Sequence, residues 1–393
     1  MAPYFEFQNA VKLLCGEFSL ERISIELEHL GASRPLVLSD AVLNKIGTLE
    51  QVTEAMQSEG ITAGAAFTDI PVDSSLAVVN KIAAYYREQG CDSIVAVGGG
   101  SVIDTAKGVR LVLSQDTDDI LSISGVENLT RGKHIPFVVV PTTAGTGSEC
   151  TGVAVIRNDA NGVKMEFLSP FVEPDIAVID PRMTMGLPPK ATASTGMDAL
   201  VHAIEACTCQ QANPLSTAYG TAAIRMIAEN VEEATRNGSN KKARFSMALA
   251  STMAGIAFSN SMVGAVHAIG HALGGVCHVP HAVAMTILLP HVMRYNLSHC
   301  AEAYAALLPW LAGLDTALDT PKEKRAEAAI AFVEELGARL NKICGLPLTL
   351  REAGVEKESF AKVAEFAVND GALIVNPRAA SEEQVVEILN AAY

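Results

Sequence analysis

Basic residues are few in this chain: 29 Lys and Arg stand against 44 Asp and Glu and leave a formal net charge of −15. A nucleic-acid partner needs a basic stripe, so this balance argues against nucleic-acid binding. The cysteines form no framework either. The eight are scattered, and Cys207 and Cys209 do not have the spacing of a CxxC redox pair or a zinc knuckle. We interpret them as reduced packing residues of a cytoplasmic protein.

Targeting signals and long apolar runs are also missing. The first residues lack the basic segment and apolar core of a secretion signal, and no low-complexity tract or fixed-period repeat is visible. Between Arg244 and Arg294 there is no Asp, Glu, Lys or Arg, but His, Ser, Asn, Gly and Pro interrupt the apolar residues repeatedly. A membrane span needs about 20 apolar residues in a row. This stretch therefore predicts a buried helical core around a site, with no membrane partner.

Two domains are expected from the 393 residues, because one domain usually takes about 100–200. The first half alternates short β-branched runs with a helical pattern at 74–89. The runs that read as strands are 36–39, 61–67, 93–97 and 137–140. They lack polar alternation, so we expect strands buried on both faces, as in a Rossmann-like parallel sheet covered by helices.

The pattern changes near residue 187, where two prolines follow a leucine. Beyond this point the periodicity is helical, over 191–206, 217–229, 241–258, 263–273 and further segments to the end. We therefore predict an α/β dinucleotide-binding domain over residues 1–187 and an all-helical metal-binding and catalytic domain over residues 188–393. A cleft between two such domains is a common place for a cofactor and a substrate to meet.

A glycine-rich loop follows the strand at 93–97 and leads into a helical pattern. Glycines let the backbone approach a ligand, and the free N–H groups at a helix start attract a pyrophosphate. A tight structural turn is the alternative. The loop residues expected to contact the cofactor are Gly98, Gly99, Gly100 and Ser101, with Asp104 in the helix that follows.

A second loop, rich in small hydroxyl residues and glycine, follows the strand at 137–140. It adds Thr142, Thr143 and Thr146 to the expected cofactor contacts, because open α/β sheets bind ligands at the carboxyl ends of their strands. Asp40 closes the first strand. Its carboxylate can accept hydrogen bonds from a ribose and repel a 2′-phosphate, which favours NAD over NADP, or it can simply cap the following helix.

Histidines gather in the second half of the chain. Asp198 and His202 are four residues apart in a helical pattern and share a face. Five of the nine histidines lie between 267 and 291, and His267 and His271 share another face. We expect this helix to end at 274–275, a glycine pair, and the next to open at a proline with His281 in its first turn. Such a reversal can return His281 close to His267.

Burial of so many imidazoles without counter-charges is costly unless something binds them. Three imidazoles and one carboxylate suit a divalent metal, either Fe²⁺ or Zn²⁺. The alternative is a set of core histidines that donate hydrogen bonds to backbone carbonyls.

Taken together, these segments resemble the iron-containing (group III) alcohol dehydrogenases. The resemblance rests on the loop at 98–101, the segment at 141–149, the Asp198/His202 helix and the histidine segment at 267–281. It runs from about Phe5 to the end and includes 376–378, Asn-Pro-Arg. It implies a dehydroquinate synthase-like fold, with a homodimer or a higher homo-oligomer as the assembly.

The resemblance also implies roles for single residues. The family's metal ligands match Asp198, His202, His267 and His281, with Fe²⁺ as the first expectation and Zn²⁺ as the alternative. His271 matches the additional active-site histidine beside the nicotinamide. Further matches are Asp40 at the NAD-selecting position, Lys164 near the cofactor and Phe258 in the substrate pocket. His278 and His291 match no ligand, and we interpret them as a residue of the site mouth and a structural residue.

The implied activity is the NAD-linked oxidation of small primary alcohols or diols, or the reduction of the aldehydes, of the ethanol, butanol, 1,3-propanediol or lactaldehyde type. The metal would polarise the oxygen, the nicotinamide would take the hydride, and His271 would relay the proton. Alternatives are a glycerol dehydrogenase-like polyol oxidoreductase and a non-catalytic nucleotide- or metal-binding protein. A dehydroquinate synthase needs basic residues, which 245–293 lacks, and metal-free maleylacetate reductases lack this ligand set.

Overall fold

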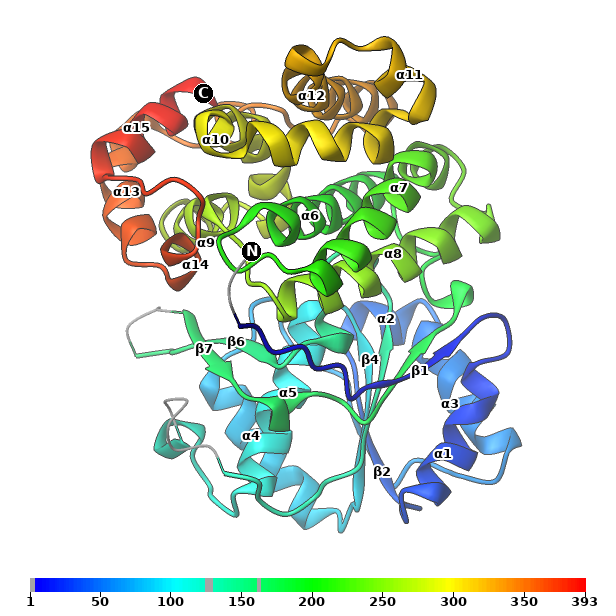
Figure 1. Cartoon of the computed structure of the whole chain (residues 1–393). Coiled ribbons are helices and arrows are strands. Elements are labelled where there is room, and N and C mark those ends of the chain that lie inside the picture. Colours follow the sequence, from blue (N-terminus) through cyan, green and yellow to red (C-terminus); the bar gives the residue numbers. More distant parts are fainter. Residues whose placement is uncertain (1–3, 124–129, 161–163) are drawn as a thin grey trace. The chain divides into compact units, whose positions relative to one another are not determined.

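The computed structural model describes residues 4–123, 130–160 and 164–393, and the chain forms two compact units (Figure 1). The α/β unit spans residues 9–186, and the helical unit spans residues 187–393 together with residues 4–8. The sequence analysis grouped residues 4–8 with the α/β half. In the structure the Gln8 N–H donates to Asn260 Oδ1 at 2.6 Å and Phe7 stacks on Tyr219, so this segment belongs with the helical unit.

A six-stranded sheet forms the centre of the α/β unit, with the strand order β1-β8-β5-β4-β2-β3. Every neighbouring pair is parallel, which confirms the predicted parallel sheet. Four of the strands are buried along their whole length, which explains their apolar composition without polar alternation. The strands are β1 (Lys12–Cys15), β2 (Pro35–Leu38), β3 (Ala65–Phe67), β4 (Ser93–Gly98), β5 (Phe137–Pro141) and β8 (Ile176–Ile179).

Successive side chains of each strand enter two separate apolar cores. In β4, Ile94 and Ala96 belong to the core beneath α4 and α5, whereas Val95 and Val97 belong to the core beneath α1 and α3. Figure 1 shows these two pairs of helices on opposite sides of the sheet. The helices of this unit are α1 (Ile23–His29), α2 (Ala41–Lys45), α3 (Thr48–Ser58), α4 (Leu76–Glu88) and α5 (Gly100–Ser114).

An antiparallel hairpin of β6 (Val153–Arg157) and β7 (Lys164–Leu168) lies outside the parallel sheet, and the sequence analysis did not predict it. Ala154 and Ile156 of β6 pack into the core beneath α5. Short 3₁₀ helices join the elements of this unit: η1 (Leu20–Arg22), η2 (Ile120–Ile123), η4 (Ser148–Cys150), η5 (Pro170–Val172) and η6 (Pro181–Met183).

The helical unit contains no strand among its described residues, which confirms the predicted all-α half. Its central helix is α6, which packs against α7, α8 and α10. The longer helices are α6 (Pro189–Thr208), α7 (Pro214–Arg236), α8 (Lys241–Ser259), α9 (Ala265–Cys277), α10 (His281–Ala312) and α12 (Arg325–Cys344). The shorter ones are α11 (Leu314–Asp319), η7 (Lys322–Lys324), η8 (Lys357–Ser359), α13 (Phe360–Val368), α14 (Gly371–Ile374) and α15 (Glu382–Ala391).

The predicted end of α9 at the glycine pair 274–275 is wrong, because the helix continues to Cys277. It ends at His278, which adopts a left-handed conformation with φ of 57° and donates its N–H to the Gly274 carbonyl at 3.2 Å. A glycine inside a helix costs about 1 kcal/mol relative to alanine, which burial of the neighbouring Leu273 and Val279 offsets. The next helix opens at His281 behind Pro280, as predicted.

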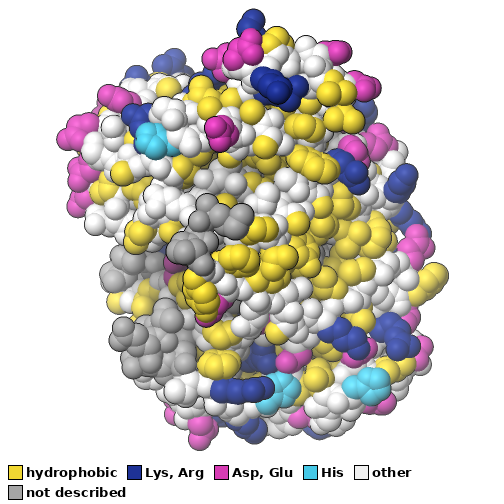
Figure 2. Space-filling view, in the orientation of Figure 1, with side chains coloured by type: hydrophobic (Ala, Val, Ile, Leu, Met, Phe, Trp, Pro, Cys, Tyr) yellow, Lys and Arg dark blue, Asp and Glu magenta, His cyan; other side chains and the backbone are white. Residues whose placement is uncertain are grey.

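The charge-free stretch between Arg244 and Arg294 forms most of α8, α9 and the start of α10, and most of its residues are buried. Within the described ranges, none of the helices has an apolar stretch long enough to cross a bilayer. On the face drawn in Figure 2, acidic and basic side chains are interspersed rather than gathered into a basic stripe.

Candidate metal centre and nucleotide-binding loops

Three polar side chains lie along one face of α6. Asp198, His202 and Glu205 are spaced four and three residues apart, so each lies about one helical turn from the next. All three are buried, with at most 6% of any residue exposed. His202 Nδ1 lies 3.8 Å from Asp198 Oδ1, as the predicted shared face requires.

The helices α9 and α10 bring two more imidazoles to the same carboxylate. His281 Nε2 lies 3.5 Å and His267 Nε2 lies 3.9 Å from Asp198 Oδ1, and His267 Nε2 is 2.9 Å from His202 Nε2. The reversal between the two helices leaves the rings of His267 and His281 with centroids 5.6 Å apart. The four residues predicted as metal ligands therefore converge within the helical unit.

Three of these side chains, Asp198, His267 and His281, each place one ligand atom within 4.8 Å of the others, as a site for a divalent cation requires. In a tetrahedral site with bonds of ~2.1 Å, ligand atoms lie about 3.4 Å apart, close to the 3.5 Å and 3.9 Å that separate Asp198 Oδ1 from His281 Nε2 and His267 Nε2. His202 lies beside this group, with Nδ1 3.8 Å from Asp198 Oδ1 and Nε2 2.9 Å from His267 Nε2. Both carboxylate oxygens of Asp198 are buried and, among the described residues, neither has a hydrogen-bond partner. A buried carboxylate in that state is costly, and a bound metal ion is the partner that its three imidazole neighbours would share.

Burial disfavours the charged forms of the titratable side chains in this cluster. It raises the pKa of Asp198 to about 8, against the lowering effect of His271. It also lowers the pKa of His267 to about 3, which keeps that imidazole neutral and able to act as a ligand. A positively charged ion beside Asp198 would favour its carboxylate form, because an opposite charge at short range stabilises the ionised state.

His271 and Phe258 flank the cluster. The ring of Phe258 stacks on His202 with centroids 4.4 Å apart and gives the cluster an apolar wall. The ring of His271 lies 5.5 Å from that of His281, and its Nδ1 lies 2.9 Å from Asp370 Oδ2. The other oxygen of Asp370 accepts the N–H of Ala372 and caps α14. No spacing in the sequence indicates Asp370, which is 99 residues from His271.

The two remaining histidines of the motif lie apart from these rings. His278 is exposed at the end of α9, and His291 is partly buried on α10. In the part of the chain that the structure describes, neither makes a ring contact with the cluster. The place of His278 at the site mouth stays a prediction.

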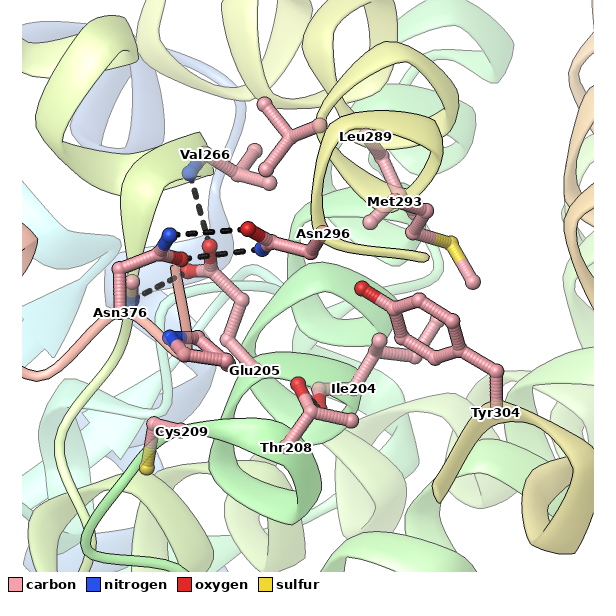
Figure 3. Close-up of a pocket in the computed structure, with 13 residues that line it drawn as sticks. Ile204, Glu205, Thr208, Cys209, Val266, Leu289, Met293, Asn296, Tyr304 and Asn376 are labelled. Atoms are coloured by element: carbon pink, nitrogen blue, oxygen red, sulfur yellow. Dashed lines mark hydrogen bonds between the residues drawn. The ribbon is translucent and has the colours of Figure 1, made fainter. Parts of the chain in front are cut away.

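Glu205 is a site residue that the sequence analysis missed. Its carboxylate lies 2.6 Å from His267 Nδ1. It also accepts from the backbone N–H groups of Gly264 at 2.9 Å and Val266 at 2.7 Å (Figure 3). The two ring nitrogens of His267 thus face Glu205 and His202 rather than backbone carbonyls, so the core-histidine alternative does not describe this residue. The signal was its spacing, three residues after His202 on the same helix face.

In the α/β unit the two predicted loops touch each other. The first runs from β4 through Gly99, the N-cap, into α5. A Cβ on Gly99 would lie 3.1 Å from Thr143 Cγ2, and one on Gly100 would lie 2.9 Å from Thr146 Cγ2. The buried Thr142 donates its N–H to the Gly98 carbonyl at 3.0 Å. The sequence-predicted glycines and threonines therefore form one surface at the start of α5, where free N–H groups attract anions.

Asp104 and Lys107 of α5 form hydrogen bonds with the second loop and with the residues that follow it. Asp104 accepts from Ser148 Oγ at 2.6 Å and from the Val155 N–H at 3.1 Å, so both oxygens are occupied within the unit. Lys107 is fully buried and donates to Ser148 Oγ, Thr151 Oγ1 and the Val153 carbonyl at 2.7–3.1 Å. Asp104 was predicted to contact the cofactor. That contact stays a prediction, and in the structure the Asp104 carboxylate joins the second loop to α5.

Asp40 caps α2, because its Oδ1 accepts from the N–H groups of Val42 and Leu43, both at 2.9 Å. This agrees with the helix-cap interpretation. The hydrogen bonds use one oxygen only, so the cap leaves Oδ2 for a ribose hydroxyl and both interpretations can hold.

Lys164 begins β7 and pairs with Asp73 at 2.8 Å. The N–H of Asp73 in turn donates to Ser101 Oγ at 3.3 Å in the first loop. Lys164 is therefore linked to the first loop through one residue, Asp73, that the sequence analysis did not single out.

Known proteins are similar to this chain in both of its halves. A family model described as "Iron-containing alcohol dehydrogenase" matches residues 10–181, and one described as "Fe-containing alcohol dehydrogenase family, C-terminal" matches residues 192–393. The chain is 38% identical over 366 residues to the 1,3-propanediol dehydrogenase of Citrobacter freundii, covering 93% of this chain and 92% of that protein.

Solved structures are similar in fold over nearly the full length. The crystal structure of a 1,3-propanediol oxidoreductase matches with a TM-score of 0.94 and 36% identity, covering 99% of this chain and 100% of the other. That of sulfoacetaldehyde reductase from Bifidobacterium kashiwanohense in complex with NAD⁺ matches with a TM-score of 0.87 and 25% identity, covering 99% and 98%. These matches extend over both units of the chain.

Proposed function

Because the chain belongs to the iron-containing alcohol dehydrogenase family and is an oxidoreductase acting on CH–OH groups, we propose that it interconverts a small primary alcohol or diol with its aldehyde. It does so with NAD and one divalent metal, held by Asp198, His202, His267 and His281. The observation that carries this proposal is the convergence of three imidazoles on Asp198, whose buried oxygens have no hydrogen-bond partner among the described residues.

Each side chain of the cluster has a separate task in the proposed reaction. A metal ion, when bound, supplies Lewis-acid chemistry that lowers the pKa of an alcohol hydroxyl. Phe258, stacked on His202, offers an apolar surface to the carbon chain of the substrate. Asp370 Oδ2 lies 2.9 Å from Nδ1 of His271 and orients that ring, which in this proposal relays the reaction's proton.

We propose NAD rather than NADP, iron rather than zinc, and a substrate from the set of ethanol, butanol, 1,3-propanediol and lactaldehyde. The NAD⁺ complex of a structural relative supports NAD, the description of the matching family supports iron, and the names of two curated relatives support 1,3-propanediol. A cytoplasmic location is supported by the eight cysteines, all of which are free thiols, as a reducing compartment keeps them. A homodimer as the basic assembly is proposed from the family resemblance alone.

The test is metal analysis of the purified protein combined with an aldehyde screen. We expect about one iron or zinc per chain and NADH oxidation that depends on a short aldehyde, with 3-hydroxypropionaldehyde, butyraldehyde, acetaldehyde and lactaldehyde as the panel. Binding of NADH without aldehyde-dependent oxidation would instead favour the non-catalytic alternative. Faster turnover with glycerol than with every primary alcohol would favour a polyol oxidoreductase.

The Asp40→Asn variant tests cofactor selection apart from helix capping. Asparagine keeps an oxygen that can cap α2 but removes the charge, so stability should hold while repulsion of a 2′-phosphate is lost. We expect the ratio of kcat/KM for NADP to that for NAD to rise at least about tenfold, equal to ~1.4 kcal/mol of lost repulsion. Steady-state kinetics with both cofactors measure it. An unchanged ratio would leave Asp40 as a helix cap only.

A Gly100→Ala variant tests whether the two loops form one cofactor site. The new Cβ meets Thr146 Cγ2 at 2.9 Å, so we expect NADH binding to weaken about tenfold, because overpacking costs about 1–3 kcal/mol. The double variant with Thr146→Ser removes that methyl group and keeps the Oγ1 that accepts from the Ser148 N–H, so binding should recover. Fluorescence titration with NADH measures both. A double variant as weak as the single one would contradict this contact.

A further inference from the structure

Glu205 is a buried carboxylate surrounded by donors. Oε2 accepts from His267 Nδ1 at 2.6 Å and from the Gly264 N–H at 2.9 Å, and Oε1 accepts from the Val266 N–H at 2.7 Å. The described residues that line the small cavity beside it include no Lys or Arg, and Leu289 and Met293 give that cavity apolar walls (Figure 3). Buried carboxylates are rare without a compensating partner, so the burial of Glu205 requires an explanation from its surroundings.

The backbone N–H groups of Gly264 and Val266 donate to one oxygen each, so both oxygens of Glu205 face a donor. A carboxylate offers two acceptor oxygens, whereas an amide would turn an NH₂ group toward at least one N–H. When Glu205 is ionised it can only accept, so at the 2.6 Å contact Nδ1 of His267 carries the proton and the lone pair of the ring lies on Nε2. Nε2 is the atom that lies 2.9 Å from His202 Nε2 and 3.9 Å from Asp198 Oδ1, at the cluster.

We propose that Glu205 is a positioning residue of the metal centre: it fixes the tautomer and the ring orientation of His267 so that Nε2 faces the ion. This inference rests on the proposed function, since it assigns the cluster to a metal. A supporting partner of this kind changes metal affinity by about 10–100-fold when it is removed.

Glu205 has a second, structural contact that the test must separate from the first. Gly264 is the N-cap of α9, and the N–H groups of Gly264 and Val266 would otherwise be without acceptors at the helix start. The N–H between them, that of Ala265, donates to Asn376 Oδ1 at 3.1 Å. Asn376 is held by two hydrogen bonds with Asn296, at 2.9 and 3.0 Å (Figure 3).

Asn376 is therefore the matched control. Like Glu205 it caps α9 from a distant segment, it is equally buried, and it lies beside the same cavity. Its hydrogen-bond partners among the described residues include no histidine: they are Ala265, Asn296, Gln210 and the carbonyls of Leu373 and Arg378. Loss of Asn376 removes a cap without disturbing Nδ1 of His267.

The experiment compares Glu205→Gln and Asn376→Ala in the full-length protein. Zn²⁺ affinity is measured by competition with a chromophoric chelator, and the ligand field by the visible spectrum of the Co²⁺-loaded protein. We expect both variants to melt at a lower temperature. Only Glu205→Gln should bind Zn²⁺ about 10–100-fold more weakly and shift the Co²⁺ bands. Equal affinities in the two variants, or a normal affinity in Glu205→Gln, would overturn the inference.

A measurement on the wild-type protein covers the case in which Glu205→Gln does not fold. In the Zn²⁺-loaded protein labelled with ¹⁵N-histidine, the signal that is lost in His267→Ala should show a protonated, hydrogen-bonded Nδ1. A proton on Nε2 would overturn the inference. Failure of the proposed function gives a different result, because the wild-type protein itself would then bind no stoichiometric metal in the competition assay.

Discussion

An Asp198→Asn variant is expected to purify without stoichiometric metal and to turn over its alcohol at least about a thousandfold more slowly than the wild type. Asp198 Oδ1 is the atom on which the three imidazoles converge, at 3.5, 3.8 and 3.9 Å. Asparagine has the same size but no charge, so the packing stays and the attraction for a cation is lost. Elemental analysis and kcat with NAD measure the two effects.

His291→Asn is the control for this experiment. His291 is a partly buried histidine of α10, the helix that also carries His281, but it makes no ring contact with the cluster among the described residues. Its variant should keep its metal and a turnover within about twofold of the wild type. Full metal content and normal turnover in Asp198→Asn would remove the basis of the proposed function.

The buried Lys107 is expected to make the stability of the protein rise with pH between about 8 and 10.5. Burial is the main cause that lowers the pKa of Lys107 to about 8, from 10.5 for an exposed lysine, against the opposing effects of Asp104 and Glu149. Between these values the unfolded chain holds a proton that the folded chain has released, so the free energy of unfolding increases with pH. The gain attributable to Lys107 is about 3 kcal/mol, and it is absent below pH 8.

This gain is measured as a difference between proteins, because thiols and phenols also titrate in alkaline solution. Urea unfolding of the wild type and of Lys107→Met is followed by circular dichroism at several pH values under reducing conditions. The difference in unfolding free energy should grow in favour of the wild type as the pH rises. For Lys81→Met, at an exposed lysine of α4 in the same unit, the unfolding free energy should change with pH as it does in the wild type. Parallel curves for Lys107→Met would contradict the prediction.

The central strands were predictable because their composition follows directly from where they lie. Strands covered on both faces, such as β4 and β5, consist almost wholly of apolar residues, and this pattern is visible in the sequence. The edge strand β1 is partly exposed and carries no such pattern. The hairpin of β6 and β7 was not predicted because its strands are only partly buried. By contrast, β8 is buried throughout and its apolar run is visible in the sequence, although it was not among the predicted strands.

Local helix propensity predicts the wrong end for α9, because it takes no account of tertiary packing. Two glycines in succession predict a helix end, yet the helix runs on because Leu273 and Val279 are buried around it. The left-handed residue that ends it is His278 rather than a glycine. The free energy of packing in the helical unit outweighs an intrinsic preference of about 1 kcal/mol per glycine.

By itself, the sequence determined which groups share a helix face: Asp198 with His202, and His267 with His271. Helical spacing is a local property, and i, i+4 partners meet whatever the rest of the chain does. The glycine loops after buried strands were likewise local signals.

Only the tertiary structure decided which of these faces meet and which residues support them. Glu205 lies 62 residues from His267, and Asp370 lies 99 residues from His271. No periodicity connects such pairs, because their contact depends on how α6, α9 and the C-terminal helices pack. That packing places the carboxylates of Glu205 and Asp370 against ring nitrogens of His267 and His271, and their roles follow from these contacts.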